Sequence, residues 1–274
     1  MIKRKFGWTD TEVPVIGQGT WMIDGSSETE SRSIQTLKLG LDLGMNHIDT
    51  AEMYGEGHVE ELVGEAIAGI RRDKIFLVSK VLPSNASYEN TLKACKQSLK
   101  RLKTEWLDLY LLHWPSRYPL SETMRAMEKL VSDGLVKYIG VSNFDVEDLM
   151  EAEQVLLTER IACNQVLYNL RNRGIEQRLL QYCSKKKIAV VGYSPFGHTN
   201  FPSPHSIEGK LLTEIGKKHN KTPRQVALNF LTRHPSTFTI PKTTRPDRVK
   251  ENSEGVGWEL SENDINEIDR IFPV

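Results

Sequence analysis

The stretch Leu107-Asp108-Leu109-Tyr110-Leu111-Leu112 is a largely apolar run that His113 follows directly. An apolar run of this length is typical of a strand that is buried on both faces of a parallel sheet. In residues 91–99, just before it, apolar side chains stand three and four positions apart, as in an amphipathic helix. A helix that precedes a buried strand predicts a βαβ unit.

Comparable apolar runs recur along the chain at a regular spacing. Six of them end on or just before a polar residue: Asp49, Lys80, His113, Ser142, Gln165 and Tyr193. Successive members are 31, 33, 29, 23 and 28 positions apart, close to one strand and one helix each. The predicted strands are residues 15–17, 47–48, 75–78, 107–112, 136–141, 162–166, 188–191 and 237–240.

Eight such strands in 274 residues predict an α/β fold, the (β/α)8 TIM barrel, with residues 1–274 as one domain. The competing architecture is a doubly wound open sheet, which normally carries a glycine-rich phosphate loop after an early strand. Gly17-Gln18-Gly19-Thr20-Trp21 matches that loop only in part, because Met22 stands where the third glycine belongs. No helical pattern begins there, so we predict the barrel.

Additional elements are expected at both ends of the barrel. Residues 2–6 and 12–15 flank Gly7-Trp8-Thr9-Asp10, which predicts a β-hairpin that plugs the N-terminal face. After the last strand, residues 246–252 and 261–271 have helical patterns. Ser261 and Asp264 form an N-cap pattern at the start of the second one. We therefore expect two extra C-terminal helices.

Composition excludes several classes of protein. The 36 basic residues balance the 36 acidic ones, so no nucleic-acid or anionic-membrane surface is predicted. Cys95, Cys163 and Cys183 are odd in number and widely spaced, which argues against a disulfide framework and a zinc site. No apolar stretch is long enough to cross a membrane, and no signal peptide is recognised. We expect a cytoplasmic protein without a metal.

Four titratable residues fall at the predicted carboxyl ends of neighbouring strands, where barrel enzymes carry their chemistry. They are Asp49, Tyr54, Lys80 and His113. A tyrosine is a weak acid at neutral pH, and a nearby ammonium stabilises its phenolate and lowers its pKa. Asp49 would compensate the charge of a buried Lys80, and His113 could orient a carbonyl oxygen. Each residue alone is explained as easily by capping, solvation or packing, but the set together favours carbonyl reduction.

Longer segments around these residues resemble the aldo-keto reductase superfamily. They are Ile48-Asp49-Thr50-Ala51-Glu52-Met53-Tyr54-Gly55, Ser79-Lys80-Val81, Leu109-Tyr110-Leu111-Leu112-His113-Trp114-Pro115 and Ile139-Gly140-Val141-Ser142-Asn143-Phe144. The resemblance continues through Asn164-Gln165-Val166, Tyr193-Ser194-Pro195 and Ile240-Pro241-Lys242, and is strongest to bacterial and archaeal single-domain NADPH-dependent aldehyde reductases. Some of these reduce methylglyoxal.

The resemblance implies residue roles at the mouth of the barrel. The catalytic tetrad would be Asp49, Tyr54, Lys80 and His113, and Trp21 and Trp114 would line the substrate pocket with His113. NADPH or NADP⁺ would lie extended across the mouth. At the nicotinamide, Ser142, Asn143 and Gln165 would contact the carboxamide, and Tyr193 would stack on the ring. Ser194 and Phe196 would follow the pyrophosphate. Lys242, Thr243 and Arg248 would hold the 2′-phosphate, Glu251 and Asn252 would contact the adenine, and Ile240 would also contact the cofactor.

Three features depart from the family pattern. Arg245 stands where many relatives have a neutral residue, and Leu82-Pro83 occupies a loop where many have an aromatic. The chain ends at Val274, which leaves no room for a long C-terminal specificity loop. A short tail implies an open pocket and broad specificity for small carbonyl compounds.

The sequence thus predicts an NADP-dependent oxidoreductase that reduces aldehydes or ketones, acting as a monomer by family default. An alternative of another class is an NADPH-binding regulatory or redox-sensing subunit with little turnover, because fold alone does not imply catalysis. A metal-dependent barrel hydrolase is disfavoured, since no cluster of His and Asp can be assembled from the strand ends.

Overall fold

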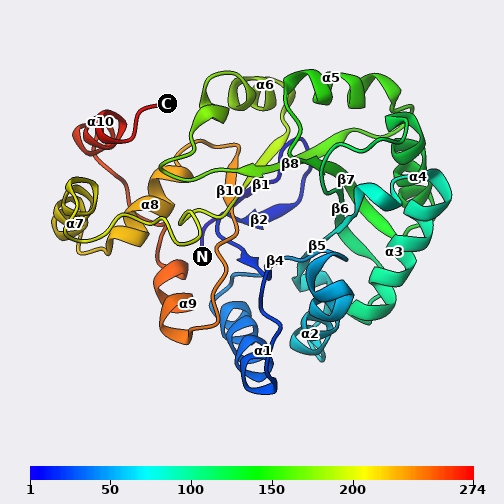
Figure 1. Ribbon diagram of the computed structural model, residues 1–274, viewed down its shortest axis with the longest axis horizontal. Coiled ribbons are helices and arrows are strands. Elements are labelled where there is room, and N and C mark those ends of the chain that lie inside the picture. Colours follow the sequence, from blue (N-terminus) through cyan, green and yellow to red (C-terminus); the bar gives the residue numbers. More distant parts are fainter.

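The computed structural model describes residues 1–274 and contains a parallel sheet whose strands follow in chain order, β3 to β10. Helices surround these strands on the outside (Figure 1). The first and last strands also meet, since the backbone of residues 15–19 pairs in parallel with residues 239–242. The barrel is therefore closed, as predicted. The strands are β3 (Gln18–Gly19), β4 (His47–Asp49), β5 (Phe76–Val81), β6 (Leu107–Leu112), β7 (Val136–Ser142), β8 (Ile161–Leu167), β9 (Ala189–Tyr193) and β10 (Thr237–Thr239).

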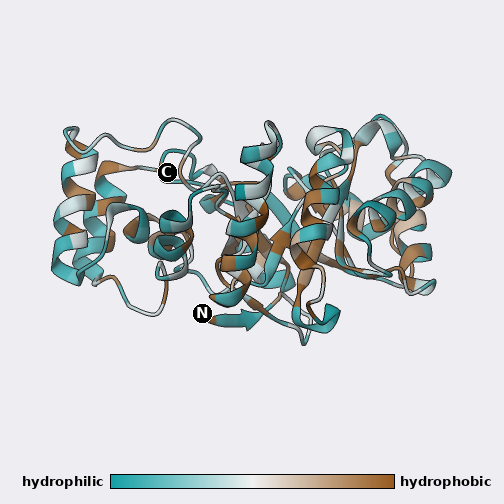
Figure 2. Cartoon of the chain, turned by 90° about the horizontal axis from the view of Figure 1, so that it is seen from below, coloured by the Kyte–Doolittle hydropathy of each residue, from teal (hydrophilic) through white to brown (hydrophobic).

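The helices pack an apolar face on the strands, and helices in Figure 2 carry both hydrophilic and hydrophobic colours. In α3, for example, the buried positions recur three and four residues apart, from Thr91 to Leu102. The helices are α1 (Ser27–Asp42), α2 (His58–Ile67), α3 (Tyr88–Leu102), α4 (Leu120–Ser132), α5 (Val146–Val155), α6 (Leu179–Lys186), α7 (Ile207–His219), α8 (Pro223–Leu231), α9 (Pro246–Ser253) and α10 (Glu262–Ile271), with 3-10 turns η1 (Tyr54–Gly57), η2 (Arg72–Lys74), η3 (Pro83–Asn85) and η4 (Gly174–Glu176).

The N-terminal hairpin is present as β1 (Lys3–Lys5) and β2 (Glu12–Pro14), paired antiparallel. Phe6, which follows β1, is fully buried against Phe76 of β5 and Phe238 of β10, with ring centroids 4.9 and 5.0 Å away. These strands lie on different sides of the barrel. The hairpin therefore closes one end of the barrel with an aromatic side chain, as predicted.

The structure differs from the predicted elements most clearly at the first strand and after β9. The first barrel strand is Gln18–Gly19 rather than residues 15–17, because Ile16 makes only an isolated bridge to Thr239 at the seam. Two helices, α7 and α8, follow β9, where the strand–helix repeat predicts one. They pack with α10 around a separate apolar cluster that includes Leu212, Phe230 and Ile268. These three helices lie at the left of Figure 1, beside the barrel.

Both C-terminal helices are present at the predicted places, as α9 and α10. Ser261 caps α10, and Asp264 completes a capping box with it. None of the helices combines the length and the apolar composition needed to cross a membrane.

Candidate active site

The parallel register brings the polar ends of β4, β5 and β6 to the same mouth of the barrel. Asp49 is the last residue of β4, Lys80 is the penultimate residue of β5, and His113 directly follows β6. Tyr54 begins η1, five residues after Asp49, and its ring centroid lies 5.9 Å from that of His113. The four predicted catalytic residues are therefore neighbours in space.

Lys80 is the centre of this group and is fully buried. Its Nζ donates to Asp49 Oδ1 at 2.6 Å and to the carbonyl of Thr50 at 2.8 Å, and it lies 3.4 Å from the Tyr54 hydroxyl. Burial lowers the pKa of an ammonium, but the charge of Asp49 and the contact with Tyr54 outweigh it and raise the pKa of Lys80. Lys80 therefore remains positively charged at neutral pH.

For the pKa of Tyr54, unlike that of Lys80, burial outweighs the neighbouring charges. Burial raises it above its ordinary value, while the charge of Lys80 lowers it and that of Asp49 raises it again. The lowering by Lys80 that the sequence predicts is present, but burial outweighs it, so the net shift of the Tyr54 pKa is upward. The reason is that a phenolate loses its hydration on burial, an effect here larger than its attraction to one cation that Asp49 partly neutralises.

His113 is a neutral imidazole at the mouth. Burial, and then the charge of Lys80, lower the pKa of His113 to about 3. Its Nδ1 is buried without a hydrogen-bond partner, and its carbonyl accepts a hydrogen bond from Asn143 Nδ2 at 3.0 Å. A neutral ring can donate one hydrogen bond to a carbonyl oxygen without adding a positive charge.

The turn that carries Tyr54 has an unusual backbone. Gly55, Glu56 and Gly57 are all left-handed, with φ of 54°, 54° and 96°. Arg101 of α3 lies against Gly57, so that a Cβ there would stand 2.6 Å from its Nε. The same guanidinium pairs with the fully buried Glu60 of α2 at 2.6 Å.

Glu60 also connects this turn to the strand that carries Lys80. Its second oxygen accepts a hydrogen bond of 2.6 Å from Ser79, the residue before Lys80 in β5. The Arg101–Glu60 pair thus links the Tyr54 turn to β5 behind the site.

A cavity of about 790 Å³ opens at this mouth. That volume lies within the range of small-molecule sites. Two of the predicted residues do not line it: Lys80 lies beneath it, fully buried, and Glu251 is bound to Arg248. The predicted residues that line it are Asp49, Tyr54, His113, Trp21, Trp114, Ser142, Asn143, Gln165, Tyr193, Ser194, Phe196, Ile240, Lys242, Thr243, Arg248 and Asn252.

At the nicotinamide end predicted from the family, the amide side chains are bonded to one another and to the tetrad. Gln165 Nε2 donates to Asp49 Oδ2 at 2.7 Å, so Gln165 also helps to hold the Asp49–Lys80 pair. Asn143, in a left-handed conformation with φ of 61°, accepts from the Tyr193 hydroxyl at 2.9 Å and donates to Ser142.

The other end of the cavity is cationic. Lys242, Arg245 and Arg248 line it, together with Arg224 of α8. Arg245 forms an ion pair of 2.5 Å with Asp247 at the rim. Arg224 was not among the residues predicted from the sequence. In the structure it lies in the first turn of α8, where Thr222 and Gln225 form a capping box.

The end of the cavity predicted to take the substrate is open and aromatic. Trp21 and Trp114 are 42% and 38% exposed and share the wall with Met22 and Met53, which the sequence argument did not identify. The Trp21 ring lies 5.0 Å from that of His198, on the segment that follows β9. Leu82 and Pro83, which occupy the loop where many relatives have an aromatic residue, do not line the cavity.

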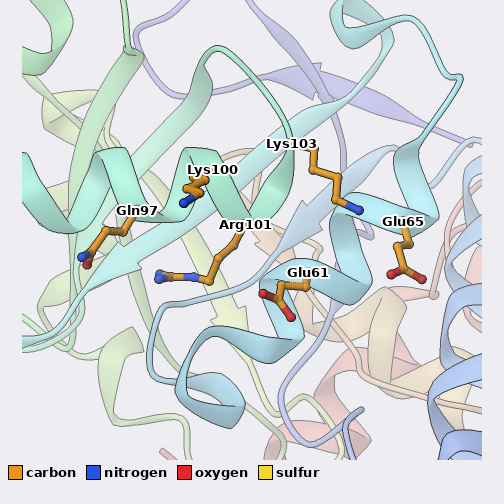
Figure 3. Close-up of a pocket in the computed structure, with 6 residues that line it drawn as sticks. All are labelled: Glu61, Glu65, Gln97, Lys100, Arg101 and Lys103. Carbon is orange, nitrogen blue, oxygen red and sulfur yellow. The ribbon is translucent and has the colours of Figure 1, made fainter.

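A second hollow, of about 470 Å³, lies between α2 and α3 on the outside of the barrel (Figure 3). No apolar residue lines it: its walls are Glu61, Glu65, Gln97, Lys100, Arg101 and Lys103. None of the four predicted catalytic residues lines it, so the candidate active site is the cavity at the barrel mouth.

Comparison with known proteins agrees with this geometry. The family model "Aldo/keto reductase family" matches residues 15–272. Methylglyoxal reductase YeaE of Escherichia coli is 39% identical over 96% of this chain and 93% of its own length, and glyoxal reductase of Bacillus subtilis is 35% identical over 95% and 89%.

Solved structures agree as well. The aldo/keto reductase of Klebsiella pneumoniae, crystallised with NADP and acetate, superposes with a TM-score of 0.90, is 38% identical and covers 99% of this chain and 95% of its own. The closed barrel, the polar cluster at its mouth and these similarities lead to one conclusion. The chain belongs to the aldo/keto reductase family and is an NADP-dependent oxidoreductase.

Proposed function

We propose that this protein reduces small aldehydes and ketones to alcohols, with Tyr54 as the proton donor. The observation that carries the proposal is the contact of the Tyr54 hydroxyl with the buried, charged Lys80, which Asp49 holds at 2.6 Å. Bound NADPH supplies the hydride. The protein's own residues orient the carbonyl, donate the proton and exclude water from part of the site.

The carbonyl oxygen would lie between the Tyr54 hydroxyl and the ring of His113. His113, kept neutral by burial, donates a hydrogen bond that orients the oxygen. As negative charge develops on this oxygen, the Tyr54 proton moves to it, and Lys80 stabilises the phenolate left behind. Asp49, held in turn by Gln165, keeps Lys80 in place.

The cavity suits a 2′-phosphorylated dinucleotide, which we assign to the residues predicted from the family resemblance. Lys242 and Arg248 would hold the 2′-phosphate, and Thr243 would bond it. Asn252 Oδ1 is buried without a partner, so it can accept from the adenine amino group. Ser142, Asn143, Gln165 and Tyr193 would surround the nicotinamide, and Ser194 and Phe196 would follow the pyrophosphate.

Small carbonyl compounds are the proposed substrates. The exposed Trp21 and Trp114 leave the substrate end open, which favours broad specificity. Methylglyoxal and glyoxal are the substrates named for the two bacterial relatives. We propose both for this protein.

The experiment that tests the proposal is NADPH oxidation by the purified protein with methylglyoxal, glyoxal and larger aldehydes, with the alcohol product identified. We expect repeated turnover on the two small aldehydes. A protein that binds NADPH tightly yet makes no alcohol from any of them would instead be the regulatory subunit considered above.

The three cysteines are free and buried, which suits a reducing compartment, so we propose a cytoplasmic location. The monomeric state and the single domain over residues 1–274 stay predictions. Analytical ultracentrifugation tests the first, and a single cooperative unfolding transition tests the second.

A further inference from the structure

Arg224 is a cavity residue to which no role has been assigned so far. It follows Thr222 and Pro223 at the start of α8, and its side chain lines the cationic end of the cavity with Lys242 and Arg248. The next residue, Gln225, donates a hydrogen bond of 3.0 Å to the carbonyl of Glu251 in α9. The start of α8 is thereby held against the helix that carries Arg248.

The guanidinium of Arg224 is held between two aromatic rings. Its central carbon lies 4.4 Å from the ring centroid of Phe196 and 4.8 Å from that of Phe201. The two rings meet edge to face at 87°. A planar guanidinium stacked in this way retains its in-plane N–H donors for a ligand, and its orientation is fixed in advance.

Arg224 differs from its arginine neighbours in its partners. Arg245 pairs with Asp247, and Arg248 with Glu251. Arg224 forms neither an ion pair nor a hydrogen bond within the protein. Burial lowers the pKa of Arg224, Arg248 and Arg245 lower it further, and Glu251 opposes them. A half-buried cation beside other cations is a favourable site for an anion.

We propose that Arg224 is a third cationic ligand of the adenosine 2′-phosphate, beside Lys242 and Arg248, and strengthens the preference for NADP(H) over NAD(H). The proposal rests on the assignment of Lys242 and Arg248 made under Proposed function. Although Arg224 also stacks on Phe196, the 2′-phosphate is favoured over the pyrophosphate because the charged groups nearest Arg224 all belong to α9 or its N-cap. They are Arg245, Arg248 and Glu251. A planar donor set suits a phosphate dianion.

Arg224 could also act only as a latch that holds the Phe196–Phe201 segment, without touching a ligand. The Arg224→Met variant separates the two roles, since Met keeps the length and the apolar contact with both rings and removes the charge. Arg125→Met is the matched control, because the Arg125 guanidinium also stacks on an aromatic ring, that of Tyr88 at 5.2 Å, but does not line the cavity.

Dissociation constants of NADP⁺, NAD⁺, 2′,5′-ADP and 5′-AMP are measured by calorimetry for each protein. We expect Arg224→Met to raise the dissociation constants of NADP⁺ and 2′,5′-ADP by roughly 10- to 100-fold. The dissociation constants of NAD⁺ and 5′-AMP, which have no 2′-phosphate, should change by less than about 2-fold. Arg224→Lys should recover part of the loss. Arg125→Met should match the wild type.

Two results would overturn the proposal. Equal weakening of all four ligands would mean that Arg224 binds another part of the nucleotide or only latches the segment. Unchanged binding would mean that it contacts no ligand. The proposed reaction is judged separately, by alcohol formation in the wild-type protein. If Arg224→Met loses affinity for the 2′-phosphate, the test of alcohol formation by the wild-type protein is unaffected. If the wild-type protein shows no turnover, the dissociation constants still test the role of Arg224.

Discussion

At the scale of single residues, the proposed site is built around one buried ion pair, Asp49–Lys80. The positions of Asp49, Lys80 and His113 at the barrel mouth were predictable because each ends or follows an apolar run, and Tyr54 lies five residues beyond Asp49. The sign of the Tyr54 pKa shift was not, because it depends on burial, which local sequence does not report. Arg224 was missed for a related reason: its two aromatic partners lie more than twenty residues before it in the sequence.

Replacing Lys80 by Met should abolish turnover and also destabilise the fold. Asp49 would then be a buried carboxylate without its cation, which costs about 3–5 kcal/mol. The double variant Asp49→Asn, Lys80→Met removes both charges and should recover most of that stability without recovering turnover. Urea unfolding and steady-state kinetics measure the two effects, with Lys74→Met as the exposed control. Turnover that returned with stability would show that Lys80 only supports the fold.

At the scale of elements, the strands were predicted well and the helices less completely. Residues 107–112 form a strand with the predicted bounds, because a run buried on both faces has no competing interpretation. The extra helix α7 was not predicted, since it packs on α8 and α10 outside the strand–helix repeat. The turn η1 was also missed. Its three left-handed residues have no helix or strand periodicity, and Arg101, which lies against Gly57, comes from another helix.

A substitution at Gly57 tests whether the turn η1 positions Tyr54. An alanine there would have an unfavourable φ of 96° and a Cβ 2.6 Å from Arg101 Nε. Gly57→Ala should lower stability by about 1–3 kcal/mol and reduce kcat, because the turn must shift. Gly69→Ala is the matched control, with φ of 80° and no atom within 4 Å of the new Cβ. It should lose stability from backbone strain alone and keep kcat. Equal kinetics for the two variants would contradict a positioning role for the turn.

At the scale of the whole molecule, closure of the barrel was predictable from the count and spacing of strands. Its seam was not, because residues 15–19 and 239–242 pair across almost the full length of the chain. The hairpin brings Phe6 against His47 and Phe76 at the closed end, where the His47 ring is fully buried with both nitrogens unpartnered.

This buried histidine makes the fold sensitive to acid. Burial, and then Lys80, lower the pKa of His47 to about 3 from 6.5. Between these values the unfolded chain binds the proton and the folded one does not, so stability falls as pH falls from 6.5 toward 3, by up to about 1.4 kcal/mol per pH unit. His113 contributes in the same direction.

His47→Leu should make the free energy of unfolding less dependent on pH in this window, and exposed His205→Leu should not. Urea titrations at pH 4.5, 5.5 and 6.5 would measure the slopes. If His47→Leu had the same slope as the wild type, burial of a neutral His47 would not be the cause of the acid sensitivity.

The central claim is that Tyr54 donates the proton in carbonyl reduction, and Tyr54→Phe tests it most directly. The variant keeps the ring and loses only the hydroxyl that lies 3.4 Å from Lys80. Single-turnover oxidation of bound NADPH by methylglyoxal would be followed beside the dissociation constant of NADPH. We predict that the rate falls by about 10²- to 10⁴-fold while the dissociation constant changes less than about 2-fold. A rate equal to that of the wild type would contradict the claim.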